Sequence, residues 1–207
     1  MCGITGGVSK RNIAGILIEG LRRLEYRGYD SAGIAVIRED RIERIRRCGK
    51  VQKLAEMVDS SHLSGHIGVA HTRWATHGKP SENNAHPHLS SGADLAIVHN
   101  GIIENYEVLK KHLLSKGFVF ESETDTEVVI HLVQEKYQQT QNIFEAVKLA
   151  SLELEGAYAL AVMSLHEPDH LVVVRKGCPL VIGVGVTLAV MVLGGLAVWL
   201  LAPGNSV

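Results

Sequence analysis

The chain has 207 residues, with 21 basic and 22 acidic side chains and a formal net charge of −1. This length suits one sizeable domain with its own core, alone or with an appendage. The balanced charge, without a basic run interleaved with aromatic residues, gives no indication of nucleic acid as a partner. Three widely spaced cysteines do not form a disulfide framework, and the N-terminus lacks a secretory signal, so we expect a cytoplasmic protein body.

Apolar periodicity predicts strands and helices in unequal alternation. Strands are expected over residues 3–8, 31–37, 41–46, 67–72, 95–99, 157–165 and 170–174, with a Pro-Asp turn between the last two. Helices are expected over residues 13–24, 53–58, 105–115, 124–137 and 142–154. A long polar stretch over 73–92 is typical of a functional or disordered loop. The alternation favours a mixed α+β layered domain over a doubly wound sheet.

The C-terminal residues differ sharply in composition from the rest. Residues 180–201 form an apolar run, preceded by Arg175 and Lys176 and carrying Trp199 near its end. This pattern predicts a transmembrane helix with its N-terminal side in the cytoplasm. The expected division is therefore a domain over 1–179, a candidate membrane helix over 180–201 and a tail over 202–207. Two alternatives stay open: a gene-level fusion to unrelated sequence, and a further strand over 180–184 before a shorter apolar segment.

Cys2 directly follows the initiator methionine. A small residue at this position favours removal of Met1, which leaves a thiol and a free α-amine on one residue. An α-amine has a pKa near ~8 and accepts a proton at neutral pH. The thiolate is the reactive form of cysteine, so this residue carries its own activating base. A lone cysteine is more often a small buried hydrophobic residue, and only the motifs that accompany Cys2 favour a nucleophile.

Those motifs are MCGI at 1–4, YRGYDSAG at 26–33, HTRWATHG at 71–78, and VHNG at 98–101 followed by SETDTE at 122–127. Together they resemble the N-terminal glutaminase domain of the glucosamine-6-phosphate synthase family, which belongs to the class II glutamine amidotransferases. The resemblance runs from Met1 to about Gly185. It implies the four-layer α/β/β/α sandwich of N-terminal nucleophile hydrolases, incomplete at its C-terminal end and followed by a helix-like apolar segment. In the family, further strands and two sugar-phosphate isomerase domains follow.

By this resemblance, Cys2 attacks the side-chain amide of glutamine, with its own α-amine as general base. The side chain of Asn100 and the backbone N–H of Gly101 would stabilise the negative charge that develops on the carbonyl oxygen. An Asn-Gly pair after a strand is also the commonest hairpin signal, so a turn at these two residues is an alternative or additional interpretation.

The resemblance also implies how free glutamine is bound. Arg73 would bind the α-carboxylate, since a planar guanidinium suits bidentate contact. Asp125 would bind the α-ammonium group. Thr76, His77 and Trp74 would line and cover the pocket, with Trp74 as a lid.

Arg27 and Asp30 are expected to support the site from behind rather than to touch substrate. The central part of the chain is rich in histidine, but no cysteine or carboxylate accompanies these residues at metal-ligand spacing. We therefore expect polar loop histidines, no metal and no cofactor. The residues concerned are His71, His77, His86, His88 and His99.

The predicted function is the glutaminase half-reaction, which releases ammonia and glutamate, without the sugar isomerase domains. Glutamine is the expected partner, nucleic acid is not, a membrane is a candidate partner through 180–201, and the family's homo-oligomerisation is in doubt for this chain. The rival hypothesis is a non-catalytic, membrane-attached or truncated fragment that binds glutamine or a protein without turnover.

Overall fold

The computed structural model describes residues 2–74, 79–183, 187–192 and 197–201. Two antiparallel sheets form its centre. The first sheet has the order β3-β2-β4-β1-β10-β9 and the second has the order β11-β8-β7-β6-β5. The strands are β1 (Gly3–Ser9), β2 (Ser31–Arg38), β3 (Arg41–Cys48), β4 (Ile67–Arg73), β5 (His88–Leu89), β6 (Leu95–Ile103), β7 (Gly156–Ser164), β8 (Glu167–Lys176), β9 (Leu180–Gly183), β10 (Thr187–Val192) and β11 (Ala197–Leu201).

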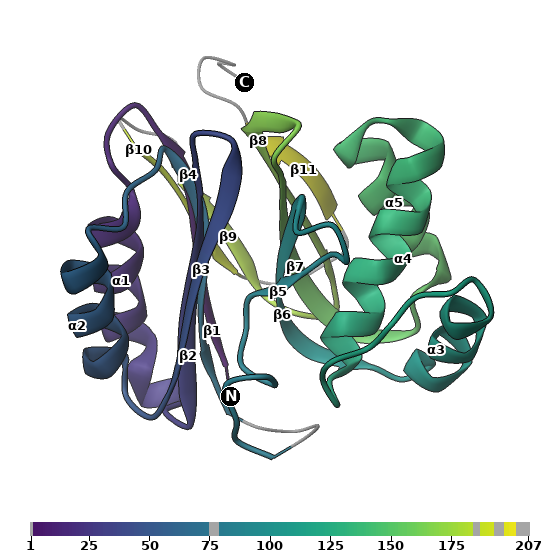
Figure 1. Cartoon of the computed structure of the whole chain (residues 1–207), viewed down its shortest axis with the longest axis horizontal. Coiled ribbons are helices and arrows are strands. Elements are labelled where there is room, and N and C mark those ends of the chain that lie inside the picture. The colour runs from purple at the N-terminus through teal and green to yellow at the C-terminus, as the bar shows by residue number, and fades with distance from the viewer. Residues whose placement is uncertain (1, 75–78, 184–186, 193–196, 202–207) are drawn as a thin grey trace.

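Helices cover the outer face of each sheet, which gives four layers in the order helix, sheet, sheet, helix (Figure 1). Helices α1 and α2 lie on the first sheet. Helices α4 and α5 pack on the second sheet, with α3 beside α4. Their bounds are α1 (Ala14–Leu24), a 3₁₀ turn (Glu25–Arg27), α2 (Val51–Ser61), α3 (Tyr106–Ser115), α4 (Asp125–Thr140) and α5 (Ile143–Glu153).

Alternation along single strands fills the layers. In β2, Ala35 and Ile37 belong to the apolar cluster between the two sheets, whereas Ile34 and Val36 belong to the cluster beneath α1 and α2. Successive side chains of a strand point to opposite faces, so one strand supplies two cores. A third cluster lies between the second sheet and its helices. Most of the predicted strands and helices are present, with ends shifted by a few residues.

The predicted Pro-Asp turn is wrong, and so is the alternative interpretation of Asn100-Gly101 as a turn. Pro168 and Asp169 lie inside β8, and the chain reverses instead at Leu165 and His166, so that Ser164 pairs with Glu167. Proline is tolerated near the start of a strand because the missing N–H costs little there. Asn100 and Gly101 do not form a hairpin turn either, because β6 continues through them to Ile103.

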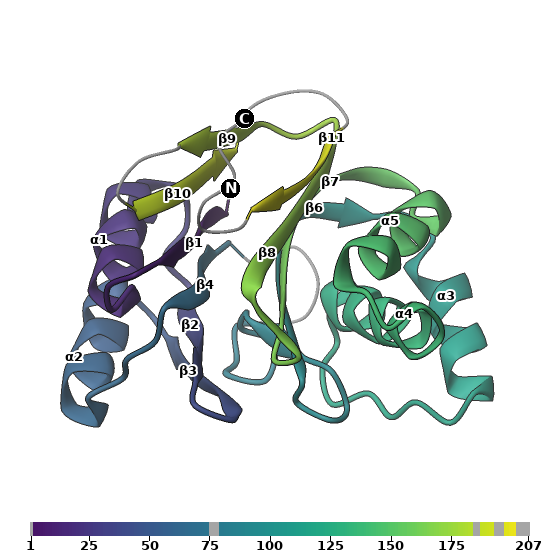
Figure 2. The ribbon, with the colours of Figure 1, turned by 90° about the horizontal axis from the view of Figure 1, so that it is seen from above.

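The transmembrane helix expected over 180–201 is also wrong. The described residues of this stretch form β9, β10 and β11, of which β9 agrees with the alternative of a further strand. Strand β10 pairs with β1 in the first sheet and β11 pairs with β8 in the second, as Figure 2 shows from above. No helix among the described residues combines the length and apolar character that crossing a bilayer requires. The apolar run therefore extends both sheets, and β1 and β8 are not left as open edges.

Candidate active site

Strand pairing places Cys2 at the end of β4. Gly3 pairs with Thr72 in the β1–β4 ladder, so the preceding residue lies beside the chain that leaves β4. The backbone N–H of Trp74 donates to Cys2 Sγ at 3.2 Å, and the thiol lies 3.5 Å from Trp74 O. The half-buried thiol is therefore held by backbone groups rather than by a side chain.

The surroundings of this thiol favour its neutral form. Burial raises the pKa of Cys2 above its ordinary value, while the Trp74 N–H bond and the positive charge of Arg73 act in the opposite direction. A thiol with a raised pKa is mostly protonated at neutral pH and needs a base to become nucleophilic. Among the described residues, the hydrogen bonds of Sγ are with the Trp74 backbone and not with a histidine. The arrangement therefore calls for a base from another source.

Asn100 reaches Cys2 from the second sheet. Its Nδ2 donates to Cys2 O at 3.3 Å, and its Oδ1 lies 2.9 Å from His71 Nε2. An amide oxygen only accepts, so His71 Nε2 must carry the proton of this bond. Burial lowers the pKa of His71 to about 3, which keeps the ring neutral. His71 thus fixes which side of the Asn100 amide faces Cys2, a role that the sequence analysis did not predict.

Gly101 is the next residue of β6 and pairs with Tyr158. Its φ is +119°, and an added Cβ would overlap Ala157 O. Only glycine fits this combination of positive φ and close backbone approach. The backbone beside Asn100 therefore has a conformation that a regular strand does not provide.

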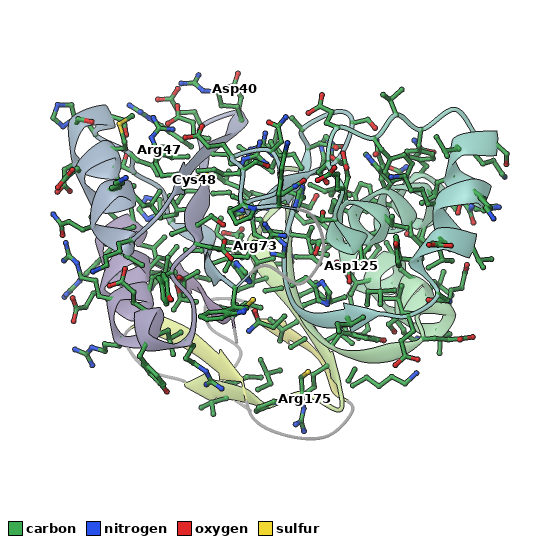
Figure 3. All side chains as sticks on the ribbon, turned by 90° about the horizontal axis from the view of Figure 1, so that it is seen from below. Asp40, Arg47, Cys48, Arg73, Asp125 and Arg175 are labelled. Carbon is green, nitrogen blue, oxygen red and sulfur yellow. The ribbon has the colours of Figure 1, made fainter. Side chains whose placement is uncertain are left out.

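The two residues predicted to bind glutamine's α-groups come from a strand of the first sheet and from a helix that packs on the second sheet. Arg73 is the last residue of β4, and Asp125 is the first residue of α4; both are buried. Figure 3 shows both near the middle of the molecule, where the two halves meet. Asp125 Oδ2 accepts from the N–H of Ile103 at 2.9 Å, and Thr124 caps the helix by accepting from the N–H of Glu127. Asp125 is therefore a buried carboxylate at the first residue of α4.

The residues predicted to line and cover the substrate are described only in part. Trp74 is 48% exposed, and its ring meets Tyr29 edge-on with ring centroids 5.5 Å apart. An exposed ring at this position is compatible with a lid. Thr76 and His77 lie outside the described residues, so their contact with substrate stays a prediction.

The expected support from residues 26–33 acts through the backbone. A Cβ on Gly28 would lie 2.8 Å from Arg73 C and O, and the Thr72 hydroxyl donates to Gly28 O. The N–H of Asp30 donates to Arg73 O at 3.2 Å. This segment thus holds the end of β4. The Arg27 guanidinium carbon lies 6.0 Å from the centroid of the Tyr26 ring, and its supporting role stays a prediction.

The expectation of polar loop histidines is wrong for the four that the structure describes. They are all buried, and His86 stacks on His71 with ring centroids 4.2 Å apart. The Thr126 hydroxyl lies 2.9 Å from His99 Nδ1 and 3.2 Å from His86 Nε2. Within the described ranges no group of three candidate ligands could hold a metal ion. These rings connect β4, β6 and α4 behind the site, and they are His71, His86, His88 and His99.

Comparison with known families decides the relationship. A family model described as "Glutamine amidotransferase domain" matches residues 71–188, more than half of the chain. The chain belongs to this family. The resemblance inferred from the motifs is thereby confirmed.

Full-length relatives are much longer than this chain. It is 60% identical over 186 residues to "Glutamine--fructose-6-phosphate aminotransferase [isomerizing]" of Acinetobacter baylyi, which covers 90% of this chain and 30% of that protein. The protein of the same name from Legionella pneumophila is 59% identical over 187 residues, again 90% of this chain and 31% of the relative. The chain thus spans about a third of the length of the curated relatives it matches.

Solved structures agree on the fold. The glutamine phosphoribosylpyrophosphate amidotransferase from B. subtilis, in complex with ADP and GMP, superposes with a TM-score of 0.79 at 26% identity. A structure titled as the allosteric regulatory enzyme of purine biosynthesis gives 0.80 at 28% identity. Each match covers 91% of this chain and 41% of the other. The two stacked antiparallel sheets are therefore the N-terminal nucleophile hydrolase arrangement of glutamine amidotransferases.

Proposed function

We propose that this chain carries out the glutaminase half-reaction, with Cys2 as the N-terminal nucleophile after removal of Met1. The observation that carries the proposal is the meeting of two sheets at Cys2. The first sheet supplies the thiol and the Trp74 N–H at 3.2 Å from it, and the second supplies the Asn100 amide. Acyl transfer needs at least a nucleophile and an oriented hydrogen-bond donor close to it.

The α-amine of Cys2 is the base that the raised thiol pKa requires. It takes the thiol proton as sulfur bonds to the side-chain carbonyl carbon of glutamine. Collapse of the tetrahedral intermediate breaks the C–N bond, and the proton passes to the leaving nitrogen, which departs as ammonia. Water then attacks the γ-glutamyl thioester and restores the thiol as glutamate leaves. One amide bond is hydrolysed, and no oxidant or reductant is needed.

Asn100 is the proposed donor to the oxyanion. Its present bond to Cys2 O is 3.3 Å long, near the weak end for N–H···O bonds, so exchanging it for a charged oxygen favours the transition state. Gly101 supports the same role through the N–H of its positive-φ backbone. The orientation of the amide comes from His71.

Arg73 and Asp125 are the proposed partners of the substrate's α-carboxylate and α-ammonium groups. They carry opposite charges, are both buried, and lie at the end of β4 and at the start of α4. Trp74 is the proposed cover, with Thr76 and His77 completing the pocket. Transfer of the ammonia to fructose 6-phosphate, which the names of the relatives imply for them, is not assigned to these residues.

The test is incubation of the purified chain with glutamine and with a glutamine-like electrophile. We expect glutamate release, and alkylation confined to Cys2 with loss of activity. Cys48 and Cys178 are internal controls, since both are also half-buried free thiols. Labelling of either control with Cys2 unmodified, or binding of glutamine without glutamate release, would favour the rival hypothesis of a non-catalytic fragment.

A further inference from the structure

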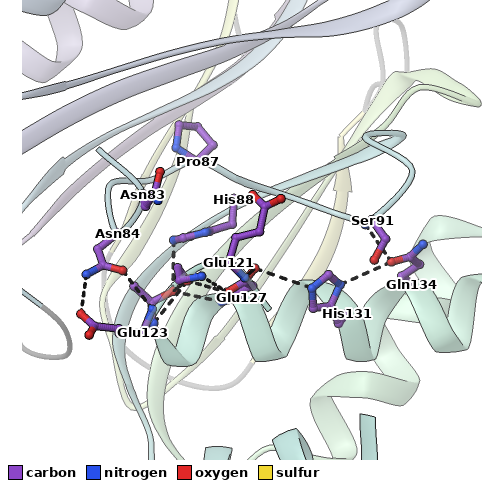
Figure 4. Close-up of polar contacts among 12 residues, drawn as sticks. Asn83, Asn84, Pro87, His88, Ser91, Glu121, Glu123, Glu127, His131 and Gln134 are labelled. Atoms are coloured by element: carbon purple, nitrogen blue, oxygen red, sulfur yellow. Dashed lines mark hydrogen bonds and ion pairs between the residues drawn. The ribbon is translucent and has the colours of Figure 1, made fainter. Parts of the chain in front are cut away.

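A cavity of about 320 Å³ lies between β3 and the turn that precedes α4. None of the proposed glutaminase residues lines it. Figure 4 shows part of its wall, with His88 of β5 near Glu127 and His131 of α4. Its lining residues are Arg44, Arg46, Asn83, His88, Leu89, Ser90, Ser91, Ala93, Val119, Glu121, Ser122, Glu127 and His131. The cavity therefore lies apart from the proposed glutaminase residues and has a largely polar wall.

Strand register aims two arginines into this cavity. Ile42 belongs to the cluster between the sheets and Ile45 packs on the helix side, so Arg44 and Arg46 share the inner face with Ile42. Both line the cavity and both are half-buried. An inner face is an unusual place for two positive charges unless something compensates them.

Among the described residues, backbone carbonyls bind both guanidinium groups directly, and the negative charges of Glu121 and Glu127 act on both arginines without an ion pair. Arg46 Nη1 donates to Asn83 O at 3.0 Å and Ala85 O at 3.1 Å, and Arg44 Nη1 donates to Pro87 O at 3.4 Å. On the outer face of the same strand, by contrast, Arg41 and Arg47 form ion pairs with Glu43 and Glu82. In the described ranges neither inner arginine has such a carboxylate partner.

The two inner arginines also repel each other. Burial lowers the pKa of Arg46 to about 10, and the charge of Arg44 lowers it in the same direction. An anion placed between the two guanidinium groups would offset both their desolvation and their mutual repulsion, because each group binds oxyanions bidentately.

The charged groups of the α4 wall already have partners. His131 is 2% exposed, and its Nε2 faces Glu127 Oε1 at 3.8 Å. Glu127 also accepts from the N–H of Glu121 at 2.8 Å and from the N–H and hydroxyl of Ser122. Glu121 is exposed at the rim and can accept hydrogen bonds from hydroxyl groups.

We propose that this cavity binds a phosphomonoester of a small hydroxylated molecule, with the phosphate between Arg44 and Arg46. Glu121 receives hydroxyl groups of the organic part. The volume exceeds what a phosphate group alone would fill and lies at the small end of ligand pockets. The site is independent of the proposed glutaminase reaction, since it uses none of its residues.

The test is isothermal titration calorimetry of the 207-residue chain without glutamine, using glycerol 3-phosphate, inorganic phosphate and glycerol. We expect binding of both phosphates, tighter for the ester, and none of glycerol. Arg44→Gln should weaken glycerol 3-phosphate binding about tenfold or more, the usual effect of losing a charge-assisted pair. The matched control Arg41→Gln, on the outer face of the same strand, should leave the affinity unchanged.

Thermal unfolding of each variant without ligand shows that it is folded. Arg46→Lys gives a second measurement, because it keeps the charge but loses the planar fork, and we expect a smaller loss than in Arg44→Gln. Absence of phosphate binding to the wild-type chain, or equal affinity in the wild type and a folded Arg44→Gln variant, overturns the proposal. Failure here leaves glutamate release unaffected, so the two proposals are separately testable.

Discussion

The contact between His71 and Asn100 yields the sharpest prediction. His71→Leu removes the donor that lies 2.9 Å from Asn100 Oδ1 and puts an apolar side chain of similar size in the same buried position. A lost neutral hydrogen bond costs about 1 kcal/mol, and a buried acceptor left unsatisfied costs about 1–3 kcal/mol. The amide of Asn100 then loses its fixed orientation, so its Nδ2 is turned toward the oxyanion for only part of the time.

The ceiling on this effect is complete loss of one oxyanion donor, about 10²–10³ in kcat. We therefore expect His71→Leu to lower kcat by about tenfold to a hundredfold, with KM for glutamine nearly unchanged, because neither residue is proposed to bind the substrate's α-groups. His71→Gln, whose amide nitrogen can donate in the same direction, should recover much of the rate. Steady-state glutamate release measures both parameters.

A double variant separates positioning from general destabilisation. If His71 acts through Asn100, then His71→Leu combined with Asn100→Ala should be no slower than Asn100→Ala alone. His88→Leu is a matched control, since His88 is equally buried but contacts Thr124 rather than Asn100. An unchanged kcat in His71→Leu, a rise in KM alone, or additive losses in the double variant would refute the reasoning.

Three further predictions concern binding, pH and backbone strain. Arg73→Ala should raise KM for glutamine far more than Arg27→Lys does, and equal effects would exclude the carboxylate assignment. Burial lowers the pKa of both His71 and His88 from 6.5 to about 3, so as the pH falls the unfolded chain takes up protons before the folded chain does. The melting temperature should therefore be constant above about pH 7 and drop below pH 6.5. A flat profile down to pH 4 would contradict this. Gly101→Ala should destabilise the fold by about 1–3 kcal/mol in urea titration and abolish glutamate release. The reason is that the positive φ of residue 101 and the nearby Ala157 O leave no room for a methyl group. A stable, active variant would disprove this prediction.

The sequence was informative where chemistry requires particular side chains. Cys2 and Asn100 were assigned from residue type and order along the chain, and the structure joins them by a hydrogen bond. Arg73 and Asp125 were predicted in the same way; both are buried, and their binding roles stay a prediction. What sequence patterns could not show was the contact between sheets, because His71 and Asn100 belong to strands that never pair with each other.

The errors have physical causes. An apolar run has no periodicity that separates buried strands from a membrane helix, although glycines at 183, 185, 194 and 195 divide this one into strand-length pieces. Asn100-Gly101 could be interpreted as a turn because a glycine with positive φ is typical of hairpin turns. In this fold the same conformation lies within strand β6. The histidines were misplaced because neutral, buried imidazole rings have no distinct sequence signal.

The nucleophile and its amide partner belong to different sheets, joined face to face by the apolar layer that includes Val98 and Met163. Sliding of one sheet over the other by a fraction of an ångström would misalign the thiol and the amide without breaking any bond in either ladder. The rate of glutamate release therefore depends on packing in this layer, although none of the proposed substrate-binding residues belongs to it. Substitutions such as Met163→Ala that loosen this layer will slow the reaction before they unfold the protein.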